Sequence, residues 1–325
     1  MTTTTAESSA DLSVTATEWL KRLAPLGVLI GVLALVGFFE PSFLAPRSLL
    51  VLIDESSTLL LLALAQMIVV LTGRITLSIA TLTSLGTILL ALWLPTLSWL
   101  AIPAVLGVSA LAGAAQGYVH HRSQVPSFVV TLGGLGIFAG IALTASGARV
   151  IGISDGFDAV SWTFGDFYEL PRSFLIALGV AVVLGLILRF TTFGRRTRAI
   201  GYSEPAGLLA GIPVGRVVVG VFTVSGLLSG LAAILLVGRS YSAGPALADS
   251  LLLPALSAVV VGGTAITGGF GGVWRTVIGV LIITVLRVGL GIMGVDPAYT
   301  QIIYGAVLAV AVALTIDRSK LATIK

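Results

Sequence analysis

RFTTFGRRTRAIGYSEPAGLLAGIPVGR, residues 189–216, is the longest strongly basic segment of this chain, and apolar runs long enough to cross a bilayer flank it on both sides. A basic polar segment between two such runs is typical of a loop on the cytoplasmic side of a membrane protein. The orientation of the whole chain therefore depends on this stretch.

A short helix is predicted inside this segment, from Ser203 to Gly211. Ser203 is suited to cap the first amides, and a first-turn acid and proline follow it. Gly211 and Pro213 end the helix. Such a helix suggests a docking element for a soluble partner, although a plain basic loop that only fixes orientation would also fit. The residues of the predicted docking helix are Ser203, Glu204, Pro205, Ala206, Gly207, Leu208, Leu209 and Gly211.

Composition places the chain among membrane proteins. Of its 325 residues, 57% are hydrophobic and 10% are charged, whereas a soluble domain carries about 25% charged residues. The net charge of +4 is not a nucleic-acid signature, so no nucleic-acid partner is expected. The absence of cysteine excludes disulfides and thiolate metal sites. A metal site at the adjacent His120 and His121 is possible, but the end of a solvated loop is the preferred interpretation, and no metal is expected.

The fold class is predicted to be an all-α polytopic membrane protein with about ten transmembrane helices, some of them interrupted. A spanning helix needs about 20 apolar residues, and the hydropathy pattern gives spans at about 23–39, 49–72, 76–94, 98–118, 127–147, 173–190, 214–238, 251–268, 273–293 and 299–316. With both termini in the cytoplasm, 13 of the 18 basic residues lie inside, four lie outside, and Arg287 lies within a span. This bias favours cytoplasmic N- and C-termini.

The predicted domains follow from the spans. Residues 1–20 form a disordered cytoplasmic N-terminus, residues 21–318 form the transmembrane domain with the loop at 189–216, and residues 319–325 form a cytoplasmic tail. The first apolar run lacks the features of a cleaved signal and is expected to be retained. The outer loop at 147–172 is acidic and aromatic, and it could serve as a lid, a docking surface for an external protein or an interfacial cover.

Two glycine-rich polar stretches interrupt the apolar runs: residues 71–78 (LTGRITLS) and residues 261–272 (VGGTAITGGFGG). Non-helical backbone at membrane depth must be buried in protein or line a watery cavity, and paired interruptions in transporters mark the substrate path. Plain turns near the cytoplasmic surface are the alternative.

Several enzymatic chemistries are excluded. The chain's lysines are Lys21, Lys320 and Lys325, and none of them follows a glycine-rich phosphate-binding loop. Neither histidine lies inside a span to activate a serine, and the spans hold no carboxylate pair for a proton relay. An enzyme is not expected. The remaining classes are a secondary transporter, a channel, or the membrane subunit of a machine powered by another chain.

Four segments carry a resemblance to a known family. LTGRITLS at 71–78 is similar to its LTGGIDLS, and VPSFVVTLG at 125–133 to its IPAFIVTLG. Residues 192–195, 199–201 and 206–212 follow its cytoplasmic loop, and residues 261–269 follow its GGTxxxGG signature. The family comprises the permease subunits of bacterial ATP-binding-cassette importers of the ribose and simple-sugar type, related to branched-chain amino acid permeases. The resemblance covers about residues 43–318.

The resemblance implies a multi-pass subunit of a bacterial cytoplasmic (inner) membrane machine. A second permease subunit would complete the path, a periplasmic binding protein would deliver a monosaccharide or related polar solute, and cytoplasmic ATPases would dock on the helix at 203–211. This chain would bind no cofactor, because ATP and Mg²⁺ belong to the ATPase. An accessory permease half, or a self-sufficient transporter or channel, is the alternative. The departures are Arg74 and Thr76, where the family has Gly and Asp, and Tyr202, where it has Asn.

Arg287 is the one basic residue expected inside a span. An arginine facing lipid at mid-span costs about 2.5–3.5 kcal/mol on insertion scales, so intramembrane charges usually face an interior. It could pair with Asp296 or Asp249 at the outer edge, or it could line the path and donate to a polyhydroxylated solute. The predicted path residues are Gly73, Thr76, Ser78, Phe128, Thr131, Gly262, Gly263, Thr264, Gly268, Gly269 and Arg287.

Overall fold

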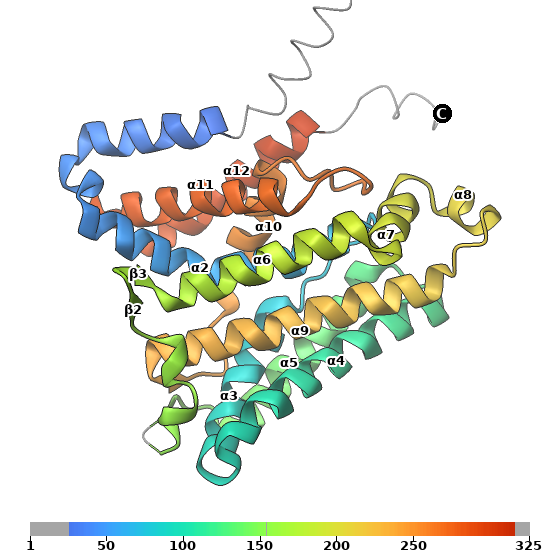
Figure 1. The fold of residues 1–325 in the computed structure, drawn as a ribbon, viewed down its shortest axis with the longest axis horizontal. Helices are drawn as coiled ribbons and strands as arrows, with labels where there is room; N and C mark the ends of the chain where they lie inside the picture. The colour runs from blue at the N-terminus through green and yellow to red at the C-terminus, as the bar shows by residue number, and fades with distance from the viewer. Residues whose placement is uncertain (1–25, 154, 316–325) are drawn as a thin grey trace, which may run out of the picture.

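A computed structural model describes residues 26–153 and 155–315, and these form a bundle of helices with almost no sheet (Figure 1). The predicted N-terminal segment 1–20 and tail 319–325 lie outside the described residues. A helix at Leu26–Phe39 comes first. It is followed by α2 (Pro46–Val70), α3 (Ile79–Leu97), α4 (Ala101–Ser123), α5 (Ser127–Ser146), α6 (Arg172–Phe190), α7 (Thr192–Tyr202), α8 (Glu204–Leu209), α9 (Val214–Ser240), α10 (Leu252–Val261), α11 (Val273–Ile292) and α12 (Pro297–Thr315).

The helices end where the local sequence favours a break. Pro46 opens α2 directly after a short 3-10 helix at Pro41–Leu44. Ser98, with a φ of 48°, separates α3 from α4, and the chain turns there (Figure 1). Gly147, at a φ of 61°, closes α5 in the left-handed region that glycine adopts readily.

Helix α2 lies at the centre of the bundle. Nearly all of its second half is buried, and it packs against α6, α9, α10 and α11. Its apolar residues on all sides are typical of a helix that is surrounded by protein. Together with residues of α6, α9 and α11, they make the largest apolar core.

Helices α4 and α9 pack side by side through small residues (Figure 1). A Cβ added at Gly113 would lie 2.1 Å from the carbonyl oxygen of Phe222, and one at Gly226 would lie 2.2 Å from that of Ser109. Membrane helices associate mainly through close packing of this kind, because moving an apolar side chain from lipid to a helix interface gives no hydrophobic gain.

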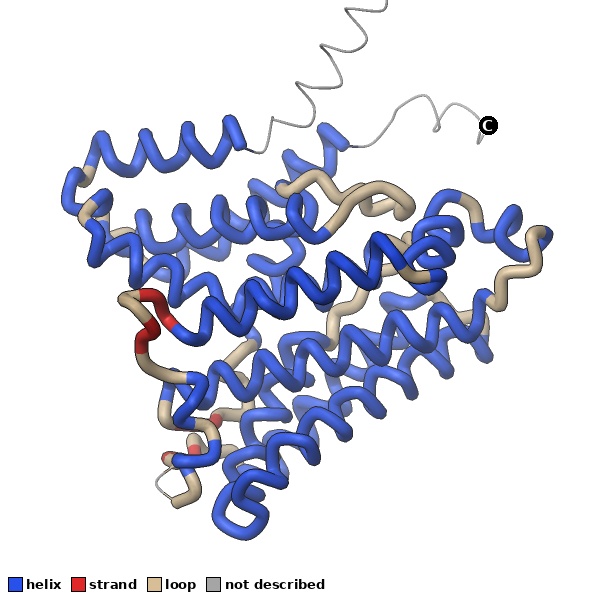
Figure 2. Tube along the Cα trace, in the orientation of Figure 1, coloured by secondary structure: helices blue, strands red, loops and turns tan. Residues whose placement is uncertain are grey.

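In the described residues, the strands lie in the loop at 147–172 and directly after α9, as the tube in Figure 2 shows. β1 (Ile151–Gly152) pairs antiparallel with β4 (Ser242–Ala243), and β2 (Asp166–Phe167) pairs with β3 (Leu170–Pro171). The rings of Phe157 and Tyr241 stack at 4.7 Å, and Ala159 and Val160 are buried, so much of the loop covers the ends of α3 and α9. The tip of the β2–β3 hairpin is exposed.

Six helical stretches are long and apolar enough to cross a membrane, and three described apolar helices are shorter. An all-α polytopic membrane protein is therefore confirmed, while the count of ten spans stays a prediction. One predicted range was wrong in extent: residues 251–268 contain a helix only at Leu252–Val261, because glycine at 262 and 263 starts a turn. The helix α7 was not predicted.

Candidate functional site

The short helix predicted between Ser203 and Gly211 is present, and a second helix, α7, precedes it. In α7, Gly194, Thr197 and Ile200 are buried while Arg195 and Arg196 are exposed, so the arginines lie on an outer face. The chain then becomes extended at Ser203 and enters α8. α8 lies at the end of the bundle opposite to the β2–β3 hairpin (Figure 1).

The ends of α8 are capped as the sequence predicts. The Ser203 hydroxyl accepts a hydrogen bond from the amide of Ala206 at 3.3 Å, and proline stands in the first turn. At the other end, the amide of Ile212 donates to the carbonyl of Gly207 at 3.0 Å, and Gly211 has a φ of 75°. A helix of six residues has little stability of its own, so these caps matter more than usual.

The apolar side of α8 faces outward. Leu208 is 59% exposed and Leu209 is 92% exposed, whereas Gly207 is buried against the body of the protein. Leu208 also borders a shallow hollow lined by residues of α4 and the start of α9, among them Tyr118 and Val219. These two neighbouring leucines, on a capped helix outside the apolar spans, form an apolar surface that the described part of the chain leaves largely uncovered.

Arg74 connects α8 to the rest of the site. Its Nη2 lies 2.8 Å from Glu204 Oε2, its Nε donates to His120 Nε2 at 2.7 Å, and its Nη1 donates to the carbonyl of Thr72 at 3.0 Å. Because the guanidinium only donates, His120 Nε2 is an acceptor, and the ring proton on Nδ1 is given to the carbonyl of Val125 at 2.7 Å. His120 is thus a neutral, hydrogen-bonded member of α4, and its assignment to the end of a solvated loop was wrong.

The two glycine-rich stretches meet each other beside α7. The amide of Gly269 donates to the carbonyl of Leu71 at 2.9 Å. A Cβ at Gly201 would lie 2.0 Å from that carbonyl oxygen, and one at Gly268 would lie 2.5 Å from the amide nitrogen of Gly73. Three segments far apart in the sequence therefore touch backbone to backbone. The ring of Tyr202 packs over Gly269, which gives that departure from the family pattern a packing role.

The second stretch is a tight loop with its own hydrogen bonds. The amide of Ala265 donates to the carbonyl of Phe270 at 2.9 Å, and Arg275 from α11 lies 4.4 Å above the Phe270 ring. Gly263, Gly268 and Gly269 all have positive φ, a conformation that disfavours other residues. Thr264 is fully buried, and its hydroxyl has no hydrogen-bond partner among the described residues.

Residues 76–78 form a buried polar cluster with side chains of α4 and α5 inside the bundle. The Ser78 hydroxyl donates to Gln116 Oε1 at 3.0 Å and accepts from its Nε2 at 2.8 Å. Thr76 Oγ1 lies 3.3 Å from Ser78 Oγ. The amide of Leu77 donates to the Thr131 hydroxyl at 3.1 Å. The structure thus brings together Thr76, Ser78 and Thr131, while Phe128, on the same turn of α5 as Thr131, is exposed.

Gln116 was not predicted as a site residue. Its signal was a lone amide within an apolar run, since polar side chains inside membrane spans are costly and usually functional. Gln66 in α2 carries the same signal. Its side chain is fully buried, and neither of its polar side-chain atoms has a partner in the described part of the chain.

Arg287 lies at the other end of the bundle. Its Nη1 is 3.8 Å from Glu55 Oε2, and its side chain is 39% exposed. Arg239 at the end of α9 is held more firmly, with Nε 3.2 Å from Asp54 Oδ2 and Nη2 bonded to Glu55. The sequence did not indicate Glu55 as the partner of Arg287. Asp249, one of the two expected partners, accepts a hydrogen bond from Ser84 on α3 at 3.0 Å.

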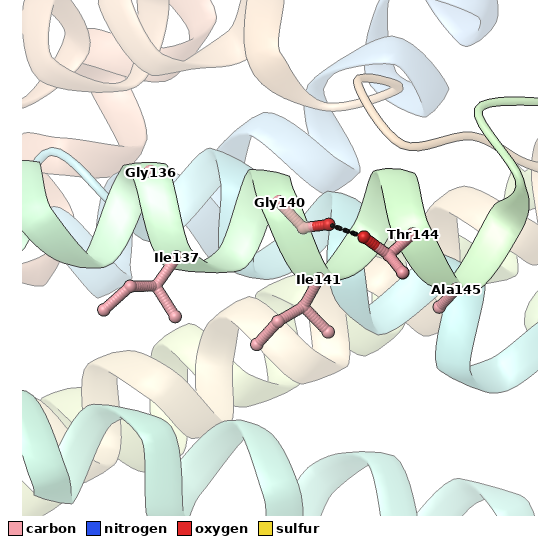
Figure 3. A pocket seen from close by; sticks show the side chains of 6 residues that line it. All are labelled: Gly136, Ile137, Gly140, Ile141, Thr144 and Ala145. Atoms are coloured by element: carbon pink, nitrogen blue, oxygen red, sulfur yellow. Dashed lines mark hydrogen bonds between the residues drawn. The ribbon is translucent and has the colours of Figure 1, made fainter.

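The face of α5 is lined by small residues and isoleucines. Gly136, Gly140, Thr144 and Ala145 lie along a shallow hollow with Ile137 and Ile141 (Figure 3). The Thr144 hydroxyl donates to the carbonyl of Gly140 at 2.8 Å, which satisfies it within the helix. The Thr144 hydroxyl is the one side-chain polar group among the six residues that line this hollow.

The fold defines the chain as a multi-pass membrane protein, with a helical core and the short capped helix α8 at one end. It belongs to the family described as branched-chain amino acid transport system / permease component, which matches residues 48–312. No solved structure gives a significant match.

Curated relatives agree with the family. The ribose import permease protein RbsC of Bacillus subtilis (strain 168) is 34% identical over 304 residues, which cover 93% of this chain and 94% of the relative. The probable ABC transporter permease protein YphD of Escherichia coli (strain K12) is 32% identical over 306 residues, 92% of each chain. The L-arabinose transport system permease protein AraH of the same strain is 31% identical over 215 residues, 66% of this chain and 65% of the relative. The resemblance to sugar ABC importer permeases is confirmed.

Proposed function

We propose that this chain is the transmembrane subunit of an ATP-driven importer that forms the path for a monosaccharide or related neutral polyol. The observation that carries the proposal is α8, a capped helix that exposes Leu208 and Leu209 at one end of the bundle. A helix laid into a groove of a partner is a recurring mode of recognition. The partner in this proposal is a cytoplasmic ATPase, which holds ATP and Mg²⁺ and hydrolyses the nucleotide.

The remaining parts of the machine follow from the family. A second permease subunit completes the path, and an external binding protein delivers the solute. The proposed topology has ten spans, both termini in the cytoplasm and the bacterial inner membrane as its site. The substrate class rests on relatives named for ribose and L-arabinose import.

The proposed path begins at the buried cluster of Ser78, Gln116 and Thr131. Hydroxyl and amide groups of this kind suit hydrogen bonding to a neutral polyol. In this arrangement the glycine contact between residues 71–73, 201 and 267–269 lies between the docking helix and the path, so it serves the coupling of the two. Arg287 lies at the opposite end and is proposed to line the outward part of the path.

The test replaces both exposed leucines, Leu208→Asp with Leu209→Asp. Burying two leucine side chains stabilises a contact by roughly 3–6 kcal/mol, so the variant should lose copurification of the ATPase and ATP-driven uptake while its membrane abundance is unchanged. Val150→Asp, which places a single such charge on an exposed residue of the loop at 147–172, is the control. Retained copurification and normal uptake would remove the docking role of α8.

A second measurement separates this function from that of a self-sufficient transporter. The purified chain is placed in vesicles without any ATPase, and uptake of labelled D-ribose is followed. The proposal requires no uptake above that of empty vesicles. Uptake under those conditions would overturn the proposal as a whole, whatever the leucine variants do.

A further inference from the structure

Arg74 uses all three guanidinium nitrogens, two of them on distant segments of the chain and one on its own turn. Nη2 binds Glu204 in α8, Nε donates to His120 in α4, and Nη1 donates to the carbonyl of Thr72, two residues earlier in the same turn. Its side chain is only 11% exposed. A planar fork with fixed donor directions can make these contacts together, whereas the single ammonium of lysine would have to choose among them.

Beyond Arg74, the following residues continue the chain of hydrogen bonds into the bundle. The amide of Ile75 donates to the Ser127 hydroxyl at 3.2 Å, and the next alternate amide, that of Leu77, donates to Thr131. The Ser78 hydroxyl then forms two hydrogen bonds with the side-chain amide of Gln116. Hydrogen bonds and a short stretch of backbone therefore connect an exposed helix to a buried polar cluster.

We propose that Arg74 is a positioning residue that transmits movement of α8 to residues 71–78 and so to the polar cluster at Ser78. This inference rests on the proposed function, because it requires a partner that moves α8. Such a partner must carry residues 71–78 along with α8 or break the Arg74–Glu204 ion pair. Coupling of this kind is reciprocal, so occupation of the cluster would also bias the position of α8.

The contacts on either side of Arg74 favour transmission over local bracing. Ser203 and residues 210–213 join α8 to α7 and α9, and these joints fix its ends without reaching the polar cluster. The Arg74–Glu204 ion pair crosses from α8 to the segment before α3, over a separation of 130 residues. If it were only a brace, its loss would lower the amount of folded protein and leave coupling intact.

The experiment is a double-mutant cycle with Arg74→Gln, Glu204→Gln and the two together. The proteins are reconstituted in vesicles with the ATPase and binding protein, and D-ribose taken up per ATP hydrolysed is measured. Each single variant should lower that ratio by about five-fold or more, the low end of typical coupling between two sites. The double variant should be no worse than the more damaging single one, because both remove the same contact.

Two further variants control the interpretation. Arg74→Lys keeps the charge but not the three-way fork, and should restore part of the ratio; Arg149→Gln, on the exposed outer loop, should leave it unchanged. Unchanged ratios in the single variants, or effects that simply add in the double variant, would overturn the inference. Reduced abundance with a normal ratio would show a brace and would also overturn it. A failure of docking itself is recognised separately, because the Leu208 and Leu209 variants would then have no effect.

Discussion

The contact at Gly201 leads to the most direct test of how the site is assembled. A methyl group at this position would lie 2.0 Å from the Leu71 carbonyl oxygen and 2.3 Å from the Gly269 amide nitrogen, the two atoms of one hydrogen bond. Real Cβ atoms essentially never come closer than 3.0 Å. Gly201→Ala must therefore separate α7 from that pair by about 1 Å or break the bond.

The expected change in the free energy of unfolding of Gly201→Ala combines two unfavourable contributions and one favourable one. Overpacking costs about 1–3 kcal/mol, and a buried group that loses its hydrogen bond costs about 1–3 kcal/mol more. Replacing glycine by alanine inside a helix returns up to about 1 kcal/mol. We expect a net destabilisation of about 1–5 kcal/mol.

The assay is thermal unfolding of the purified protein in detergent, followed by tryptophan fluorescence, with the half-life at a fixed temperature as a second measure. Gly179→Ala is the matched control, because Gly179 also lies in a helix but a Cβ added there would meet no atom within 4 Å among the described residues. That control should be neutral or slightly stabilised. If Gly201→Ala unfolds at the same temperature as Gly179→Ala, the inferred close contact of the three segments is wrong.

Two further predictions concern the path. Gly263→Val should impair uptake more than Gly31→Val, because Gly263 has a φ of 88° in the turn after α10, whereas a Cβ added at Gly31 would meet no described atom within 4 Å; equal tolerance would mean that the turn is not strained by a side chain. Arg287→Gln should keep partial uptake and Arg287→Met should lose it at equal membrane abundance, because only Gln retains a donor. Normal uptake by both Arg287 variants, or failure of both to accumulate, would contradict a role in the path.

Local signals in the sequence were sufficient for the long helices and for α8. Apolar runs predict spanning helices because lipid leaves the backbone no other partners. The cap of α8 is encoded within a few residues, by Ser203, Pro205 and Gly211, and the structure forms it as expected. In these places the local sequence is enough to predict the conformation.

Helix α7 could not be found in this way, because its stability comes from the tertiary fold. Its sequence TFGRRTRAIGY contains two glycines and two threonines, which lower its intrinsic helix propensity. The helix is held by its inner face, where a Cβ at Gly194 would lie 2.2 Å from the carbonyl oxygen of Leu188. Such a contact is visible only once the neighbouring helix is placed.

The charged pairs were also beyond the reach of sequence reasoning. Arg74 and Glu204 are 130 residues apart, and Arg239 and Glu55 are 184 residues apart. Nothing in the local pattern selects these partners from the other acids of the chain. The sequence singled out Arg74 only as a departure from the family motif, whereas the structure gives that departure a partner.

The outer charges show how two arginines of similar sequence context acquire different uses. Arg239 directs Nε to Asp54 and Nη2 to Glu55, and Asp54 also accepts from the Ser173 hydroxyl at 2.5 Å, so this group ties α2, α6 and α9 together. Arg287 makes a looser pair with Glu55 at 3.8 Å, and its side chain is 39% exposed. Two arginines against two carboxylates leave this group without net charge, which reduces its attraction for charged solutes. Under the proposed function, a neutral polyol is the solute class that such a balance favours, and Arg287 is the proposed donor to it.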